Sequence, residues 1–143
     1  MQTALWYQQL LKPSWAPPSW IFGPVWTVLY AIIVASFAAV FYKVFTREIP
    51  WFVAVPFALN LIFNVAFSPI QFGLKNNLLA SIDILLVLGT LIWALFALYS
   101  YGLTRHIETG VPTYTWIIVA NIPYLLWVAF ASILQLTITY LNA

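Results

Sequence analysis

Long stretches without a charged side chain are the feature of this sequence that most limits what it can fold into. Four apolar stretches are separated by short polar connections, and Asp83 is the only ionisable residue well inside any of them. A charge at the centre of a bilayer costs about 3 kcal/mol on insertion scales, so uncharged stretches of this length are typical of membrane-spanning helices. Because 64% of the residues are hydrophobic and only 6% are charged, the chain cannot cover a globular core with a water-exposed surface. We therefore expect an integral membrane protein.

Charges and prolines set the boundaries of the expected spans. A single transmembrane domain over the whole chain, 1–143, is expected to contain four of them, at about residues 21–42, 49–74, 78–103 and 112–141. Arg105, His106, Glu108 and Gly110 would form the polar connection before the last span. In lipid every backbone polar group has to be paired within the protein, and the sequence lacks the alternating pattern of membrane strands, so helices are expected. The predicted fold class is an all-α integral membrane protein, a four-helix transmembrane bundle.

Amide side chains recur along the second span. At about 100° per residue, Asn60, Asn64 and Gln71 lie within about 40° of one another on a helix. Phe67 lies on the same face. Amides buried in hydrocarbon need hydrogen-bond partners, so this face must point to another helix or to a ligand cavity. Contact with another helix and contact with a ligand both stay open as interpretations. Pro69 is expected to interrupt the helix near the end of the span.

The fourth span carries a second face, about 80° wide, that combines aromatic, small and amide side chains. Its members are Tyr124, Trp127, Ala131 and Gln135. A large aromatic beside a small residue can frame a flat apolar ligand, and amides can orient the polar edge of that ligand. Packing of Trp127 against neighbouring helices explains the pattern equally well, so both interpretations stay open. Pro123 is expected to kink this span.

Two titratable residues, Asp83 and His106, are candidates for a functional role. Asp83 lies about one and a half turns into the third span, and an ionisable residue inside a membrane is a functional candidate by default. The alternative is a packing residue that is hydrogen-bonded to an amide of the second span or to the pair Asn76 and Asn77. His106 is the sole histidine, which favours a solvated side chain over a metal or haem ligand. No metal site is predicted.

The distribution of charged residues excludes several classes of function. Five basic and three acidic residues are scattered along the chain, so the sequence offers no basic patch for nucleic acid. Cysteine is absent, and the carboxylates are too few for ordinary acid–base or nucleophilic catalysis. A small proton-coupled drug exporter would need a carboxylate deep in its first span, and residues 21–42 contain none. We expect no conventional enzyme and no nucleic-acid partner.

Three blocks of sequence resemble one known family. Residues 6–30 read WYQQLLKPSWAPPSWIFGPVWTVLY, with a Trp-Tyr start, Lys-Pro, spaced tryptophans, Pro-Pro and then Gly-Pro-x-Trp-Thr at the start of a helix. This segment is similar to the signature of the translocator protein family, the tryptophan-rich sensory proteins (TspO/MBR). Residues 59–72 (LNLIFNVAFSPIQF) and 122–131 (IPYLLWVAFA) resemble the amide-bearing third helix and the fifth helix of the family. With the region around Asp83, the resemblance covers essentially the whole chain.

This resemblance implies a fold and a ligand site. Family members usually have five helices, so the four spans would correspond to helices 2–5, with the first helix absent before Trp6. Residues 6–22 would cover an aromatic pocket. Carried over by motif, the residues lining that pocket would be Trp26, Asn64, Phe67, Ser68, Gln71, Tyr124, Trp127 and Ala131. Asn60 and Asp83 would be structural polar residues.

The resemblance also implies a function. The chain would be a receptor or carrier in a prokaryotic cell membrane that binds porphyrin-type tetrapyrroles, with a protoporphyrin-like ligand, and senses or handles them under stress. One alternative is light- and oxygen-dependent porphyrin degradation that uses Trp26 and Trp127, and another is an assembly partner without a small-molecule role. No obligatory cofactor is expected, and a homodimer in the lipid bilayer is implied. The sterol-recognition pattern of animal members is not matched, because Tyr140 is not followed by a basic residue.

Overall fold

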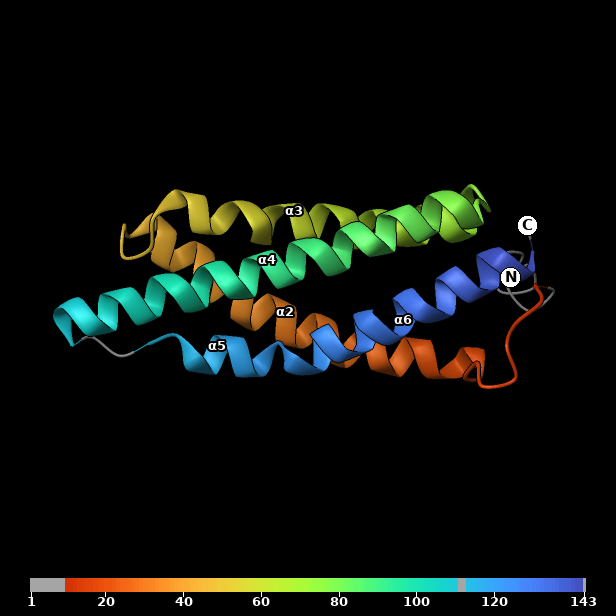
Figure 1. Cartoon of the computed structure of the whole chain (residues 1–143), viewed down its shortest axis with the longest axis horizontal. Helices are drawn as coiled ribbons and strands as arrows, with labels where there is room; N and C mark the ends of the chain where they lie inside the picture. Colours follow the sequence, from red (N-terminus) through yellow and green to blue (C-terminus); the bar gives the residue numbers. More distant parts are fainter. Residues whose placement is uncertain (1–9, 111–112, 143) are drawn as a thin grey trace.

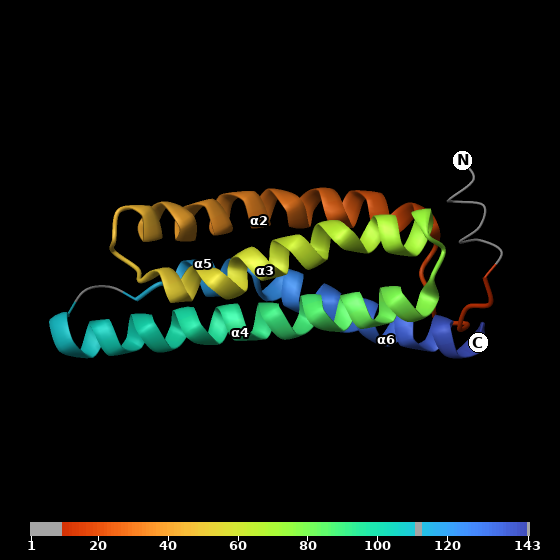
Figure 2. The ribbon, with the colours of Figure 1, turned by 90° about the horizontal axis from the view of Figure 1, so that it is seen from above.

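The computed structural model describes residues 10–110 and 113–142, and within them every regular element is helical. The elements in chain order are the short 3-10 helix η1 (Ser19–Ile21), α2 (Phe22–Phe45), α3 (Trp51–Ser68), the π-helix η2 (Pro69–Gly73), α4 (Asn77–Thr109), α5 (Thr115–Ala120) and α6 (Ile122–Leu141). The long helices lie side by side along one axis (Figure 1). The start of α2, the turn between η2 and α4, and the end of α6 lie at one end of this bundle (Figures 1 and 2).

Within residues 10–110 and 113–142, three helical stretches are long and apolar enough to cross a membrane. They are Phe22–Phe45, Asn77–Thr109 and Thr115–Leu141, and Trp51–Phe67 is a shorter apolar helix. A helix rises 1.5 Å per residue, so the 33 residues of α4 measure about 50 Å and exceed the hydrocarbon core of about 30 Å. The chain is therefore a multi-pass integral membrane protein, and the ends of α4 project beyond the hydrocarbon.

The C-terminal end of α4 differs from the expectation. Arg105, His106 and Glu108 were expected in a connection, but they form the last turns of the helix. Gly110 ends it in the left-handed conformation at φ 74°, and its N–H donates to the carbonyl of His106 at 2.8 Å. Arg105 in these last turns is bonded to the chain beyond the helix, because its Nη1 donates to the Tyr114 hydroxyl at 3.0 Å.

A polar cluster beside the α2–α3 turn fixes this end of the bundle. Lys43 Nζ lies 3.0 Å from Glu48 Oε2, and Arg105 Nη1 donates to the Glu48 carbonyl at 3.0 Å. The Tyr101 hydroxyl donates to the same carbonyl at 2.9 Å. The rings of Tyr101 and Tyr114 stack with centroids 6.4 Å apart and planes at 9°. The cluster joins α2, the turn, α4 and the residue before α5.

Two prolines coincide with changes in helix geometry. At Pro69 the α-helix becomes the π-helix η2, and the Leu74 N–H donates to the Pro69 carbonyl at 2.9 Å. Pro123 lies in the first turn of α6, where a missing N–H is harmless. The break between α5 and α6 falls at Asn121, whose buried Nδ2 donates to Ser36 Oγ at 3.0 Å. The helix is thus interrupted near Pro69 and near Pro123, as the sequence predicts.

The apolar core runs along the bundle axis. α3 and α6 both pack on α4, and α2 packs on α3 and α5. The largest fully buried side chains of the core include Phe37, Phe57, Ile84, Leu91, Leu98, Ile117, Tyr124 and Ile138.

Candidate ligand site

A chain of hydrogen bonds crosses the interior at the level of the α3 amides. Asn60 and Asn64 are one turn apart on α3, and both are buried. The Tyr30 hydroxyl of α2 donates to Asn64 Oδ1 at 3.0 Å, and Asn64 Nδ2 donates to the Tyr124 hydroxyl of α6 at 2.7 Å. Tyr124 donates in turn to Asn60 Oδ1 at 2.8 Å. Asn60 Nδ2 completes the chain by donating to the Val87 carbonyl of α4 at 2.9 Å.

The sequence left two interpretations of the amide face open, and the hydrogen bonds favour one of them for Asn60 and Asn64. Both polar ends of each amide have a partner on another helix. Buried amides with such partners hold helices together, and an unpaired one would cost about 1–3 kcal/mol. The two asparagines therefore act as interhelical hydrogen-bonding residues and place Tyr124 at the centre of the bundle.

Aromatic side chains gather between the hydrogen-bond chain and the start of α2. The ring of Trp26 lies 5.5 Å from that of Tyr30 and 6.5 Å from that of Tyr124. On α6, Trp127 contacts Phe22 edge-on with centroids 5.9 Å apart. Trp127 also contacts Phe130 at 5.5 Å, so aromatic rings line both α2 and α6 here.

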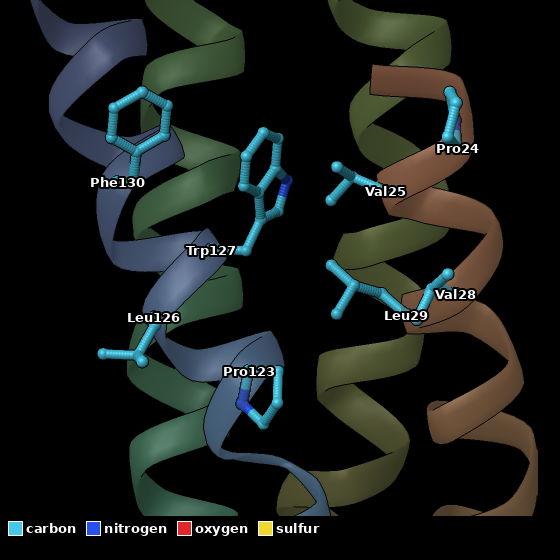
Figure 3. Close-up of a pocket in the computed structure, with 8 residues that line it drawn as sticks. All are labelled: Pro24, Val25, Val28, Leu29, Pro123, Leu126, Trp127 and Phe130. Carbon is cyan, nitrogen blue, oxygen red and sulfur yellow. The ribbon is translucent and has the colours of Figure 1, made fainter. Parts of the chain in front are cut away.

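An apolar groove of about 570 Å³ lies between α2 and α6 (Figure 3). Its lining consists of Pro24, Val25, Val28, Leu29, Pro123, Leu126, Trp127 and Phe130. Leu29 is only 4% exposed and forms part of the floor, whereas Val28 and Leu126 are 60% and 65% exposed and form the rim. The volume falls within the roughly 300–1,000 Å³ that is usual for small-molecule sites.

The Trp127 side chain supplies the polar atom of this groove. Figure 3 shows its ring standing between α6 and α2, with the ring nitrogen on the side of Val25. This Nε1 is buried and has no hydrogen-bond partner among the described residues. Indole N–H groups usually find an acceptor when they are buried. The groove therefore has apolar walls, with an unpaired indole N–H buried beside it.

The predicted lining residues separate into groups in the structure. Trp26, Asn64 and Tyr124 lie together at the hydrogen-bond chain, and Trp127 lies in the adjacent groove. Phe67 and Ala131 are half-buried and pack against the apolar core. The side chains of Ser68 and Gln71 lie outside the described residues, as do residues 6–9 of the expected covering segment. Whether these residues bind a ligand stays a prediction.

Several residues of this region were not predicted. Tyr30 lies one turn after Trp26 on α2, and this spacing is the signal that could have found it. Phe22 and Val25 lie within one turn before Trp26 on the same helix. The valine and leucine walls of the groove give no signal in the sequence, because such residues occur on every face of a membrane helix.

The structure shows the surroundings of two further polar residues, Asp83 and Gln135. Asp83 is 5% exposed, and its Oδ2 has no hydrogen-bond partner in the part of the chain that the structure describes. Asn76 is already engaged, because its side chain caps α4 by accepting from the Leu79 N–H at 2.9 Å. Gln135 does not face the groove with Trp127: its Nε2 lies 3.4 Å from the Asn77 carbonyl of α4.

Residues 10–22, named the strap here, run from the side of α6 to the start of α2. Leu10, Ala16 and Phe22 pack against Leu134 and Ile138 of α6. The ring of Trp15 lies 5.9 Å from that of Phe130. Asn142 fastens the strap with two hydrogen bonds to Leu11: the Leu11 N–H donates to Oδ1 at 3.1 Å, and Nδ2 donates to the Leu11 carbonyl at 2.9 Å. The strap thus closes the end of the bundle beside the aromatic cluster.

Replacing Asn142 with alanine should loosen the strap without unfolding the bundle. Both hydrogen bonds to Leu11 are exposed, and such bonds are each worth about 0.5–1.5 kcal/mol. We expect the Leu11 amide to exchange with deuterium about tenfold faster, and the unfolding midpoint to stay unchanged. Hydrogen–deuterium exchange with mass spectrometry measures this. Thr137→Ala, which removes a hydroxyl bonded within α6, is the control, and equal exchange in both variants would contradict the role of Asn142.

Comparison with known proteins identifies relatives along the whole chain. The sequence profile of the TspO/MBR family matches residues 1–141. A tryptophan-rich protein TspO of Bacillus cereus is 40% identical over 96% of this chain and 80% of its own length. The translocator protein of Homo sapiens is 33% identical over 91% of this chain and 70% of its own. A tryptophan-rich sensory protein of Cereibacter sphaeroides is 32% identical, with coverage of 96% and 77%.

Proposed function

The chain belongs to the TspO/MBR family, and from this premise we propose that it is a membrane receptor or carrier for porphyrin-type tetrapyrroles. The observation that carries the proposal is the indole of Trp127, which stands in an apolar groove with its N–H unpaired. A flat conjugated ring gains from contact with aromatic faces, and an apolar site needs few polar groups to orient its ligand.

The groove and the aromatic cluster suit the two parts of such a ligand. Below the exposed rim, Val25 and Leu29 contact the apolar macrocycle, and Trp127 and Phe130 offer aromatic surface. The buried, unpaired Trp127 N–H is the donor to a propionate group at the edge of the ring once the indole turns toward the bound ligand. Because the hydroxyl and amides of Tyr124 and Asn64 are bonded to each other, they support the wall of the site and leave recognition to the tryptophan.

The proposal includes the arrangement of the helices in the membrane. α3 together with η2 forms a further crossing beside the three membrane-length stretches, which gives four crossings that correspond to helices 2–5 of the family fold. The strap then lies at the membrane surface, where its aromatic residues suit the interface.

A titration with mesoporphyrin, which carries two propionates, tests the proposed function. Binding is followed in lipid nanodiscs through energy transfer from tryptophan to the porphyrin. We expect binding at micromolar porphyrin or below, and an affinity about tenfold weaker for Trp127→Phe, which removes the N–H and part of the aromatic surface. Trp93→Phe is the matched control, because Trp93 is exposed on α4.

Etioporphyrin, a porphyrin without carboxylates, separates the role of the N–H from that of the ring. The wild type should bind it more weakly than mesoporphyrin, whereas Trp127→Phe should bind the two ligands equally. If the wild type showed no energy transfer to mesoporphyrin, or if Trp127→Phe and Trp93→Phe bound it equally well, the proposed function would be wrong.

A further inference from the structure

We propose that the gap between α2 and α6 is a lateral portal through which the ligand reaches Trp127 from the lipid phase and returns to it. This inference rests on the proposed function and adds the route of the ligand. It concerns the groove that Trp127 lines, which lies between the first turns of α2 and the first half of α6.

The rim and the floor of the groove differ in exposure in the way that a portal requires. Val28 of α2 and Leu126 of α6 are 60% and 65% exposed and face outward, whereas Leu29 at the floor is 4% exposed. Figure 3 shows the lining side chains of α2 and α6 on the two flanks of the groove. In a membrane-spanning chain, the outer surface at this level contacts hydrocarbon. A molecule dissolved in the lipid therefore meets the groove without crossing any part of the protein.

The apolar lining of the groove excludes a water-filled route for the ligand through the same opening. All eight lining side chains are apolar apart from the indole N–H, so water gains nothing there and a flat apolar molecule loses little on leaving the lipid. The ligand could alternatively reach Trp127 from the end of the bundle, but the strap closes that route. Its Leu11 backbone is bonded twice to Asn142, and Phe22 contacts the ring of Trp127.

A portal has a kinetic property that distinguishes it from a binding wall. An obstruction in a route raises the barrier for the ligand in both directions, so it slows association and dissociation by one factor and leaves the dissociation constant unchanged. A bulky side chain in a binding wall instead weakens equilibrium binding. Val28 is suited to this test because its exposed side chain can be enlarged without overpacking the core.

The experiment compares Val28→Phe with Val34→Phe in nanodiscs whose lipid is preloaded with mesoporphyrin. Val34 is also exposed on α2 but does not line the groove. Stopped-flow energy transfer gives both rate constants. We expect Val28→Phe to slow association and dissociation at least about tenfold with an unchanged dissociation constant, and Val34→Phe to match the wild type. Leu126→Phe, on the opposite rim, should repeat the result.

Other outcomes would overturn the portal. Unchanged rate constants in Val28→Phe and Leu126→Phe would reject it, and so would weaker equilibrium binding with an unchanged association rate. Faster association in Asn142→Ala, combined with unchanged rates in Val28→Phe, would place the route under the strap. All of these results presuppose that the wild type binds mesoporphyrin. A wild type that does not bind would reject the proposed function itself, which keeps the two failures apart.

Discussion

Tyr124→Phe is expected to lower the free energy of unfolding by about 2–3 kcal/mol, because it removes the hydroxyl at the centre of the interhelical hydrogen-bond chain. The hydroxyl accepts from Asn64 Nδ2 and donates to Asn60 Oδ1. Asn64 Nδ2 and Asn60 Oδ1 would each lose their partner in a position that water does not reach, since the ring is fully buried. Hydrogen bonds in membrane proteins average about 0.6 kcal/mol, and this loss is larger because it leaves both a donor and an acceptor unsatisfied.

Denaturation by sodium dodecyl sulfate in mixed micelles measures the effect, with near-ultraviolet circular dichroism as the readout. Tyr140→Phe is the matched control, because that side chain is 81% exposed and its loss of a hydroxyl should change stability by less than about 0.5 kcal/mol. Equal midpoints for the two variants would show that the hydroxyl of Tyr124 contributes no net stability.

Gly102→Ala is expected to lower the free energy of unfolding by about 1–3 kcal/mol through overpacking. A Cβ atom at this position would lie 3.0 Å from Cδ2 of the Tyr114 ring and 3.4 Å from the Tyr114 backbone nitrogen. The ring cannot move away easily, because it stacks on Tyr101 and its hydroxyl accepts from Arg105. The added methyl group therefore strains the contact between α4 and the start of α5.

Gly89→Ala provides the opposite result on the same helix. A Cβ atom at Gly89 meets no described atom within 4 Å, so only the helix propensity of alanine acts there, worth about 0.5–1 kcal/mol in favour of folding. The two variants should therefore shift the denaturation midpoint in opposite directions. A shift of equal sign in both would contradict the close contact at Gly102.

Much of the fold could be predicted because the bilayer limits the alternatives. Charge-free stretches located the membrane-length helices, and prolines located the breaks at Pro69 and Pro123. The end of α4 was missed because Arg105, His106 and Glu108 look like a connection by polarity alone. Gly110 was the better signal, since glycine in the left-handed conformation ends a helix whatever the polarity of the preceding turn.

The candidate site was predicted less completely for a physical reason. Helical spacing shows which side chains share a face, so Asn60 and Asn64 were correctly expected to face inward. Spacing does not show which hydroxyl of another helix comes opposite an amide, because this depends on how far one helix is shifted along its neighbour. The pairing of these amides with Tyr30 and Tyr124, and the groove beside Trp127, could therefore be found only in three dimensions.

The hydrogen-bond chain across the bundle has a polarity. From Tyr30 through Asn64, Tyr124 and Asn60, each group donates to the next, and the last acceptor is the backbone carbonyl of Val87. A carbonyl oxygen can only accept, so this final bond dictates the direction of all the others, and turning either amide over would set donor against donor or acceptor against acceptor. A sliding or rotation of one helix cannot be absorbed by local rearrangement, and the bundle is thereby confined to one register.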